Sequence, residues 1–289
     1  MTIPKLPLDE WIESIVNGLE DRLSVLFDIF STVIEGIVDF FSFLFLLPPS
    51  LLMVVILAAV AYWFASTSLA VFTLLGLFLI DNLGYWEHTM DTLALVMTSA
   101  TISIILGVPL GILCARDNKI QNLLTPVLDF MQTMPAFVYL IPAVTFFGLG
   151  VVPGVIASVI FAVPPTIRLT NLGIRQVPHD LIEAGEAFGS TPNQKLFKIQ
   201  LPLAVPSIMA GINQTIMLAL SMVVISSMIG AQGIGADVYR AVTQIKTGQG
   251  FEAGLCIVIL AILLDRLSQH LVKRKQKSPA VRCQVPDSR

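Results

Sequence analysis

Charged residues are scarce in this chain. Of its 289 residues, 13% are charged and 55% are hydrophobic, whereas about a quarter of a water-soluble domain is charged. The mean hydropathy is +0.82, and several apolar runs approach or exceed the ~20 residues that cross hydrocarbon as a helix. Those runs lack the alternation of membrane β-barrels. The composition therefore excludes a soluble globular domain and predicts an all-α polytopic membrane protein.

Residues that carry enzyme or metal chemistry are few or badly spaced. The three cysteines give no disulfide framework, and Cys114 and Cys256 lie in apolar runs where buried, inert thiols are expected. The three histidines are scattered without metal-ligand spacing. The sequence also lacks the G-x-x-x-x-G-K-[ST] phosphate loop. We therefore expect no catalytic site and no cofactor bound by this chain, and energy from ATP would have to come from a partner.

The charges that are present are distributed unevenly. Residues 1–47 contain eight acidic residues against Lys5 and Arg22, whereas the chain is basic from Arg266 onward. Because Lys and Arg near span ends are retained inside the cell, a cytoplasmic C-terminus is predicted. Counting back through seven apolar spans places the polar segment 168–205 inside and the N-terminus outside. The spans are expected at 50–64, 69–85, 93–114, 135–149, 152–167, 207–229 and 251–271.

The N-terminal segment has the pattern of an amphipathic helix. Apolar residues recur at three- and four-residue steps over 9–42, and carboxylates occupy the other face. We expect this helix to lie along the interface or to brace other helices, with an ordinary surface helix as the alternative. The predicted domains are an extracytoplasmic scaffold helix at 1–47, two accessory spans at 48–88, a core at 89–271, and a basic, disordered cytoplasmic tail at 272–289.

The polar segment 168–205 contains the signals of two short helices. Gly189 is placed to end the first helix. Thr191 and Gln194 have the spacing of a capping box at the start of the second, and Pro202 is expected to stop it.

A structured hairpin on a water-facing side of a membrane protein predicts a docking surface. Small residues near the bend let a partner approach the backbone, and Phe188 and Phe197 are candidate apolar anchors for a partner's groove. The alternative is a helical lid that packs only on its own spans.

The hairpin carries a spacing typical of one protein family. Glu183-Ala184-Gly185 is followed by three residues and Gly189, then by nine residues and Ile199-x-Leu201-Pro202. This pattern resembles the EAA loop of ABC importer permeases, with Gly185 in place of the third-position alanine as its one departure. Three further segments are similar to permeases of the glycine betaine/proline/choline (quaternary-ammonium osmoprotectant) importers: QTMPAFVYLIPAV (132–144), FAVPPTIRLTNLGIRQVP (161–178) and AVTQIKTGQGFEAG (241–254).

The resemblance implies a fold, a set of partners and a location. The fold would be that of type I ABC importers (methionine-permease-like), with about seven transmembrane helices after an amphipathic N-terminal helix. Two permease copies would form the pathway in the bacterial cytoplasmic membrane. An extracytoplasmic substrate-binding protein would deliver glycine betaine or a related compatible solute, and no nucleic acid is implied. Two ATPase subunits, which would hold ATP and magnesium, would couple through Glu183, Ala184, Gly185, Phe188, Gly189, Ile199, Leu201 and Pro202.

Pathway residues are predicted from polar and aromatic groups within the spans. Polar groups inside a bilayer usually face protein or water, and aromatic faces suit a methylated cation. Interhelical hydrogen bonding and core packing are the alternatives. Asp265 is expected near a span end, in a local pair with Arg266. The candidates are Met134, Phe137, Tyr139, Phe146, Asn213, Met217 and Ser221.

Two other functions are compatible with the same pattern. A permease for methionine or another small solute would share the hairpin. A self-contained secondary transporter would need its own coupling-ion site, for which the spans offer few charged residues.

Overall fold

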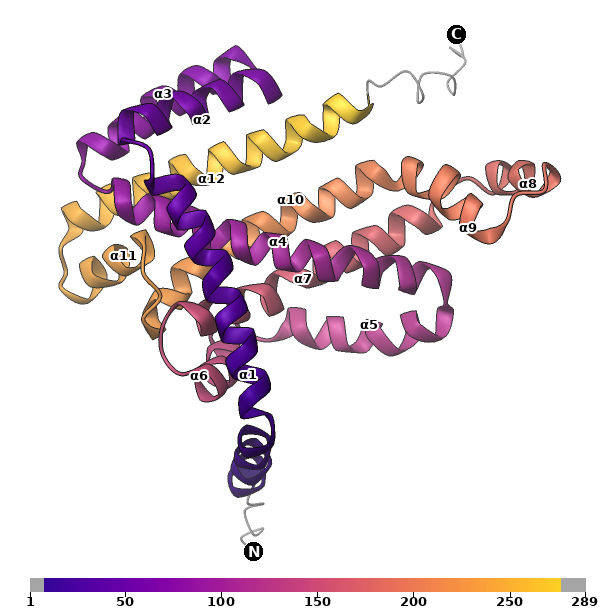
Figure 1. The fold of residues 1–289 in the computed structure, drawn as a ribbon, viewed down its shortest axis with the longest axis horizontal. Coiled ribbons are helices and arrows are strands. Elements are labelled where there is room, and N and C mark those ends of the chain that lie inside the picture. Colours follow the sequence, from indigo (N-terminus) through magenta and orange to yellow (C-terminus); the bar gives the residue numbers. More distant parts are fainter. Residues whose placement is uncertain (1–7, 277–289) are drawn as a thin grey trace, which may run out of the picture.

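The computed structural model describes residues 8–276, and every element in that range is helical (Figure 1). The first half contains α1 (Leu8–Leu46), α2 (Ser50–Phe64), α3 (Thr67–Asn82), α4 (Trp86–Arg116), α5 (Asn118–Thr133), the 3₁₀ turn η1 (Ala136–Tyr139) and α6 (Leu140–Phe147). The second half contains α7 (Val151–Arg175), α8 (His179–Ala187), α9 (Pro192–Lys195), the π-helical turn η2 (Leu196–Gln200), α10 (Leu201–Ser226), the 3₁₀ turn η3 (Ser227–Ile229), α11 (Ile234–Thr243) and α12 (Thr247–Gln276).

The long helices α4, α7, α10 and α12 form a bundle along the long axis, with α5 beside them (Figure 1). Helix α7 packs against both α4 and α10, and glycines allow the close approach. A Cβ added to Gly111 of α4 would lie 2.6 Å from Cβ of Thr170 in α7. A Cβ on Gly173 of α7 would lie 2.6 Å from Cβ of Ser207 in α10. Small residues at such interfaces are what helix packing in a membrane requires.

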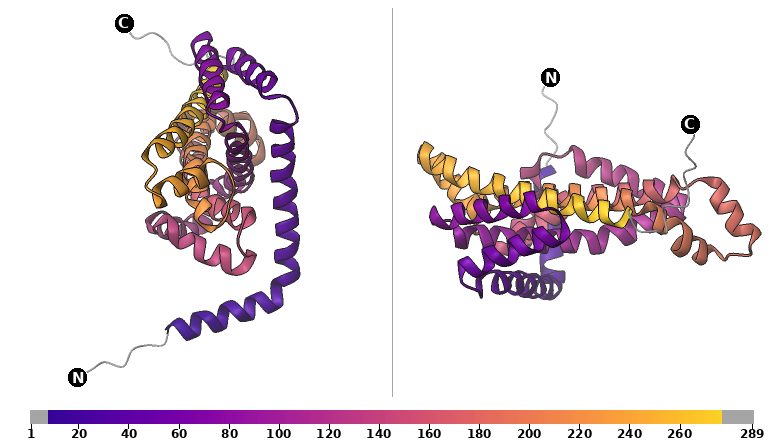
Figure 2. Two further views of the ribbon diagram at one scale, coloured as in Figure 1. Left: turned by 90° about the vertical axis from the view of Figure 1, so that its left-hand side faces the viewer. Right: turned by 90° about the horizontal axis from the view of Figure 1, so that it is seen from above.

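Helix α1 runs crosswise to this bundle, as both views in Figure 2 show. It contacts α4, α6 and α7, and it buries Ile34 and Val38 against them. The ring of Phe27 lies 4.9 Å from that of Phe146 and 5.2 Å from that of Phe147 in α6. By length and composition its segment Arg22–Leu46 could also cross a membrane. In this structure, however, its contacts are those of a brace laid across three helices.

A helix that sequence reasoning missed follows α4 directly. No helix is expected between the spans at 93–114 and 135–149, but α5 occupies most of this interval. Asp117 alone separates α4 from α5, and its side chain accepts a hydrogen bond from the Lys119 amide at 2.7 Å. Helix α5 and the segment Ala136–Phe147 are apolar enough to span a membrane together, although they are bent by 111°. The fourth span expected at 135–149 covers η1 and α6, the second part of this bent pair, and its bounds stay a prediction.

The membrane candidates can be compared with the seven expected spans. Within residues 8–276, four helical segments are long and apolar enough to cross: Arg22–Leu46, Trp86–Arg116, Val151–Arg175 and Pro192–Ile229. The apolar helices α2 and α3 are shorter, and α12 covers the last expected span. The number seven stays a prediction. The expected disordered tail at 272–289 is wrong for its first five residues, which continue α12 to Gln276, and the remainder lies outside the described residues.

Candidate coupling site

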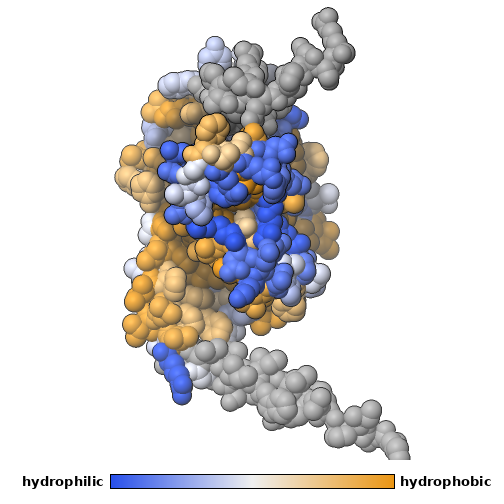
Figure 3. Space-filling model, turned by 90° about the vertical axis from the view of Figure 1, so that its right-hand side faces the viewer, coloured by the Kyte–Doolittle hydropathy of each residue, from blue (hydrophilic) through white to orange (hydrophobic). Residues whose placement is uncertain are grey.

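The polar hairpin projects beyond the bundle at one end, which we call the hairpin end (Figure 1). Figure 3 looks onto this end and shows hydrophilic residues gathered in the middle, with hydrophobic residues along the flanks. The predicted turn chemistry is confirmed. Gly189 follows α8 with φ +77°, a conformation that favours glycine. Thr191 and Gln194 form both hydrogen bonds of a capping box, at 2.9 and 3.3 Å.

The expectation that Pro202 stops the second helix is wrong. Helix α9 runs through η2 into α10 without a break, and Pro202 stands in the first turn of α10. The π-helical turn explains why the proline is tolerated. The amide of Leu201 donates to the carbonyl of Leu196, five residues back, so the hydrogen-bond ladder is already shifted where a proline would otherwise break it. The hairpin is thus rigidly continuous with a membrane helix.

The base of the hairpin is anchored in the bundle by an apolar cluster. Ile174, Leu196, Ala204 and Ile208 are buried there together, drawn from α7, η2 and α10. Leu196 is only 2% exposed. The base of the hairpin is therefore packed against both of the long helices that flank it.

Gly185, the departure from the family pattern, lies on the inner side of the hairpin. This glycine is buried in α8, and an added Cβ would lie 2.7 Å from Cδ1 of Ile199. Glu186 and Lys195 also form an ion pair between the two arms. The hydrogen bond and the charge of Lys195 lower the pKa of Glu186. Gly185, Ile199 and this pair therefore set how closely the two arms lie.

The outer side of the hairpin presents the predicted anchors to solvent. Phe188 is 91% exposed and Phe197 is 63% exposed. Ala184 is also exposed, and Glu183 lies 2.9 Å from Nδ1 of His179 on the same exposed face. Two large apolar side chains without cover in an otherwise polar hairpin are the composition of a binding patch.

The candidate pathway residues fall into two groups. Met217 and Ser221 lie along an open face of α10 that also includes the exposed Gln214. Phe137 of η1 is 53% exposed, and Met134 beside it is half-buried. Because a polar side chain such as that of Gln214 does not face lipid in the middle of a span, this face of α10 is suited to water or to another protein surface.

Three other candidates point elsewhere. Asn213 donates to Oδ1 of Asp265 in α12 at 3.1 Å. Asp265 also accepts from Gln269 at 2.8 Å, so it lies in an interhelical network and not in the expected pair with Arg266. Tyr139 is 5% exposed and donates to the carbonyl of Met131. Phe146 packs on Phe27, as described above. These three residues hold helices together in this structure, which was the alternative interpretation.

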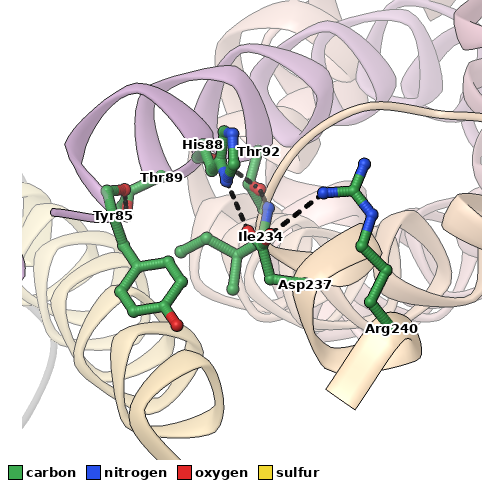
Figure 4. A network of polar contacts seen from close by, with 7 residues as sticks. All are labelled: Tyr85, His88, Thr89, Thr92, Ile234, Asp237 and Arg240. Atoms are coloured by element: carbon green, nitrogen blue, oxygen red, sulfur yellow. Dashed lines mark hydrogen bonds and ion pairs between the residues drawn. The ribbon is translucent and has the colours of Figure 1, made fainter. Parts of the chain in front are cut away.

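The opposite end of the bundle, which we call the loop end, contains a polar network that sequence reasoning missed. In Figure 4, His88 at the start of α4 points toward Asp237 of α11, with 2.5 Å between Nδ1 and Oδ2. Nη1 of Arg240 lies 3.6 Å from the same carboxylate. The amide of Ile234 donates to the Thr92 hydroxyl at 2.9 Å. His88 and Asp237 are 149 residues apart in sequence, so no local pattern could have paired them.

This network borders a cavity of about 350 Å³. Its lining includes His88, Arg240, Tyr239 and the glycine-rich loop 230–233. The network therefore ties α11 and that loop firmly to the start of α4.

Comparison with known proteins identifies the family to which this architecture belongs. Residues 107–277 match the family described as the binding-protein-dependent transport system inner membrane component. The chain belongs to this family. It is 55% identical to the glycine betaine transport system permease protein OpuAB of Bacillus subtilis over 283 residues, which cover 96% of this chain and 99% of the relative.

A second relative and a solved structure agree with this assignment. The glycine betaine/carnitine transport permease protein GbuB of Listeria monocytogenes is 54% identical, with 94% of this chain and 98% of the relative covered. An inward-facing structure of the MetNI methionine ABC transporter matches with a TM-score of 0.61 at 21% identity, covering 66% of this chain and 95% of that chain. The structural match shows the fold, which is that of a type I ABC permease, as predicted. The chain is thus a multi-pass inner-membrane permease subunit and not an enzyme.

Proposed function

We propose that this chain is the permease subunit of an ATP-binding-cassette importer that takes up glycine betaine or related compatible solutes. The observation that carries the proposal is the identity of 54–55% over nearly the whole chain to two permeases named for glycine betaine. The methionine alternative is less well supported, because the likeness to MetNI is at 21% identity.

The hairpin 178–202 is proposed as the place where the ATPase docks. Phe188 and Phe197 would enter its groove, and Glu183, Ala184, Gly189, Leu201 and Pro202 would complete or support the surface. ATP and magnesium would stay on the ATPase. Because η2 joins the hairpin to α10 without a break, movement of the ATPase would tilt α7 and α10 directly.

The proposed orientation puts the hairpin end in the cytoplasm and the loop end outside. The assembly would contain two copies of this chain, two ATPase subunits and one substrate-binding protein outside the membrane. The open face of α10 with Gln214, Met217 and Ser221 would line the pathway, together with Met134 and Phe137. Asn213, Tyr139 and Phe146 would act only by positioning those helices.

The test is uptake of labelled glycine betaine into proteoliposomes that contain the chain, its ATPase and its binding protein, with ATP inside. Uptake is expected to require all three proteins and ATP, and an excess of unlabelled methionine should not compete. Uptake without the ATPase would favour a secondary transporter. Competition by methionine would favour the other substrate class.

A further inference from the structure

The loop between α11 and α12 forms the far tip of the loop end (Figure 1). It consists of residues 244–246, and its backbone makes the two hydrogen bonds of a Schellman motif. The amide of Lys246 donates to the carbonyl of Ala241 at 2.8 Å, and that of Ile245 donates to Val242 at 3.3 Å. The residue at the Ile245 position of such a motif must adopt the left-handed conformation, which is why glycine usually stands there.

Ile245 adopts this conformation with φ +55°, and it is the one non-glycine residue with positive φ among residues 8–276. A β-branched side chain is poorly suited to it. The side chain is 86% exposed, so packing within the chain does not compensate for the strain. Strained residues of this kind concentrate where a contact with another molecule uses them.

Other exposed apolar side chains flank Ile245. Val242, at the end of α11, is 69% exposed, and Phe251, the fifth residue of α12 and the start of the span expected at 251–271, is 74% exposed. The two helices are closely packed at this point, since a Cβ on Gly250 would lie 3.3 Å from Cβ of Ala241. We call the exposed apolar side chains of Val242, Ile245 and Phe251 the apolar knob. It is held in place because α11 and α12 are closely packed and because the network of Figure 4 ties α11 to α4.

The charges that face outward around the knob are positive. Arg240 is 67% exposed, and Lys246 is exposed as well. The nearby carboxylate of Asp237 is only 14% exposed and lies between His88 and Arg240, with Nη1 of Arg240 at 3.6 Å, and Glu252 is half-buried. Lys and Arg are depleted from short outer loops. Two of them beside the apolar knob therefore favour a partner whose surface is anionic.

We propose that Val242, Ile245 and Phe251, ringed by Arg240 and Lys246, dock an acidic-rimmed apolar depression on the soluble substrate-binding protein. This inference rests on the proposed function, because it places the binding protein outside and the loop end toward it. Ile245 would be the central anchor, and the two cations would orient the approach.

The experiment measures the affinity of the binding protein for the complete permease–ATPase complex in nanodiscs, together with stimulation of ATP hydrolysis. Ile245→Gly is expected to weaken binding about tenfold or more while leaving the melting temperature equal or higher, because it removes the strain. Ile245→Leu, which keeps an apolar side chain, should bind within about threefold of wild type. Lys246→Glu should weaken binding, most strongly at low salt.

The matched control is Lys119→Glu in the first turn of α5, an exposed charge that lies outside the hairpin 178–202 and outside the loop 244–246; it should leave binding-protein affinity unchanged. Equal affinities for wild type, Ile245→Gly and Lys246→Glu would overturn the inference. Quenching of an Ile245→Trp variant by brominated lipid would overturn it in favour of a membrane contact. Failure of the proposed function is distinguishable, since the wild-type complex would then not respond to a glycine betaine-binding protein at all.

Discussion

Replacing Phe188 by alanine distinguishes between two roles of the hairpin: a docking surface for another protein, and a lid that packs only on its own chain. The side chain is 91% exposed in the permease, so Phe188→Ala removes almost no contact within the chain. The permease should melt within the range of an ordinary surface substitution, about ±0.5 kcal/mol in stability. If the ring is buried by the ATPase, its full burial is worth about 1.5–3 kcal/mol. That free energy corresponds to a loss of roughly 10- to 140-fold in affinity.

The assay is titration of the ATPase onto the permease in nanodiscs, with thermal unfolding measured in parallel. Phe130→Ala serves as the matched control, because that ring is 64% exposed on α5, away from the hairpin. The control should bind the ATPase like wild type. An unchanged affinity for Phe188→Ala would refute the assignment of Phe188 as an anchor. A large fall in the melting temperature would show instead that the ring packs on its own chain.

Three further substitutions test the arms of the hairpin and the helix contacts behind them. Gly185→Ala should gain up to about 1 kcal/mol of helix propensity but displace the tip of Ile199. The melting temperature should therefore change little, whereas ATPase coupling, measured as uptake per ATP hydrolysed, should fall. Because the pKa of Glu186 is lowered, its pairing stabilises the hairpin above about pH 4.5 and is lost as the pH falls through the lowered value. Measured against the intrinsic exchange rate at each pH, the protection of the hairpin amides from hydrogen exchange should fall in acid for wild type and much less for Glu186→Gln. Asn213→Leu should destabilise the permease by about 1 kcal/mol by leaving Asp265 short of a donor, and unchanged thermal unfolding would remove Asn213 from the α10–α12 contact.

Local signals predicted much of the hairpin correctly. The glycine turn at Gly189 and the capping box at Thr191 depend only on residues within a few positions, so their pattern is complete in the sequence. The prediction that Pro202 ends the second helix was wrong because the effect of this proline depends on the π-helical turn before it. That turn has no sequence signature. Helix α5 was missed because only one residue separates it from α4, so no clear break marks its start. The break that is visible in the chain lies at its other end, before α6.

Contacts between distant segments could not be read from the sequence. Asn213 and Asp265 are 52 residues apart, and spacing within one helix cannot show that their faces meet. The same holds for His88 and Asp237. The left-handed conformation of Ile245 could not be predicted for another reason. Glycine is the usual sequence signal for that backbone conformation, and here the residue is isoleucine. The all-α polytopic membrane class, by contrast, followed from composition and from the length of the apolar runs, and the type I permease fold followed from the resemblance of the hairpin to the EAA loop.

The central claim is that the hairpin 178–202 receives the ATPase and passes its movement into α10. The most direct measurement is hydrogen–deuterium exchange of the permease in nanodiscs, with and without the ATPase. Exchange should slow across residues 179–200 and stay unchanged across residues 230–246 at the other end. Protection of residues 230–246, or none across 179–200 at saturating ATPase, would contradict the account.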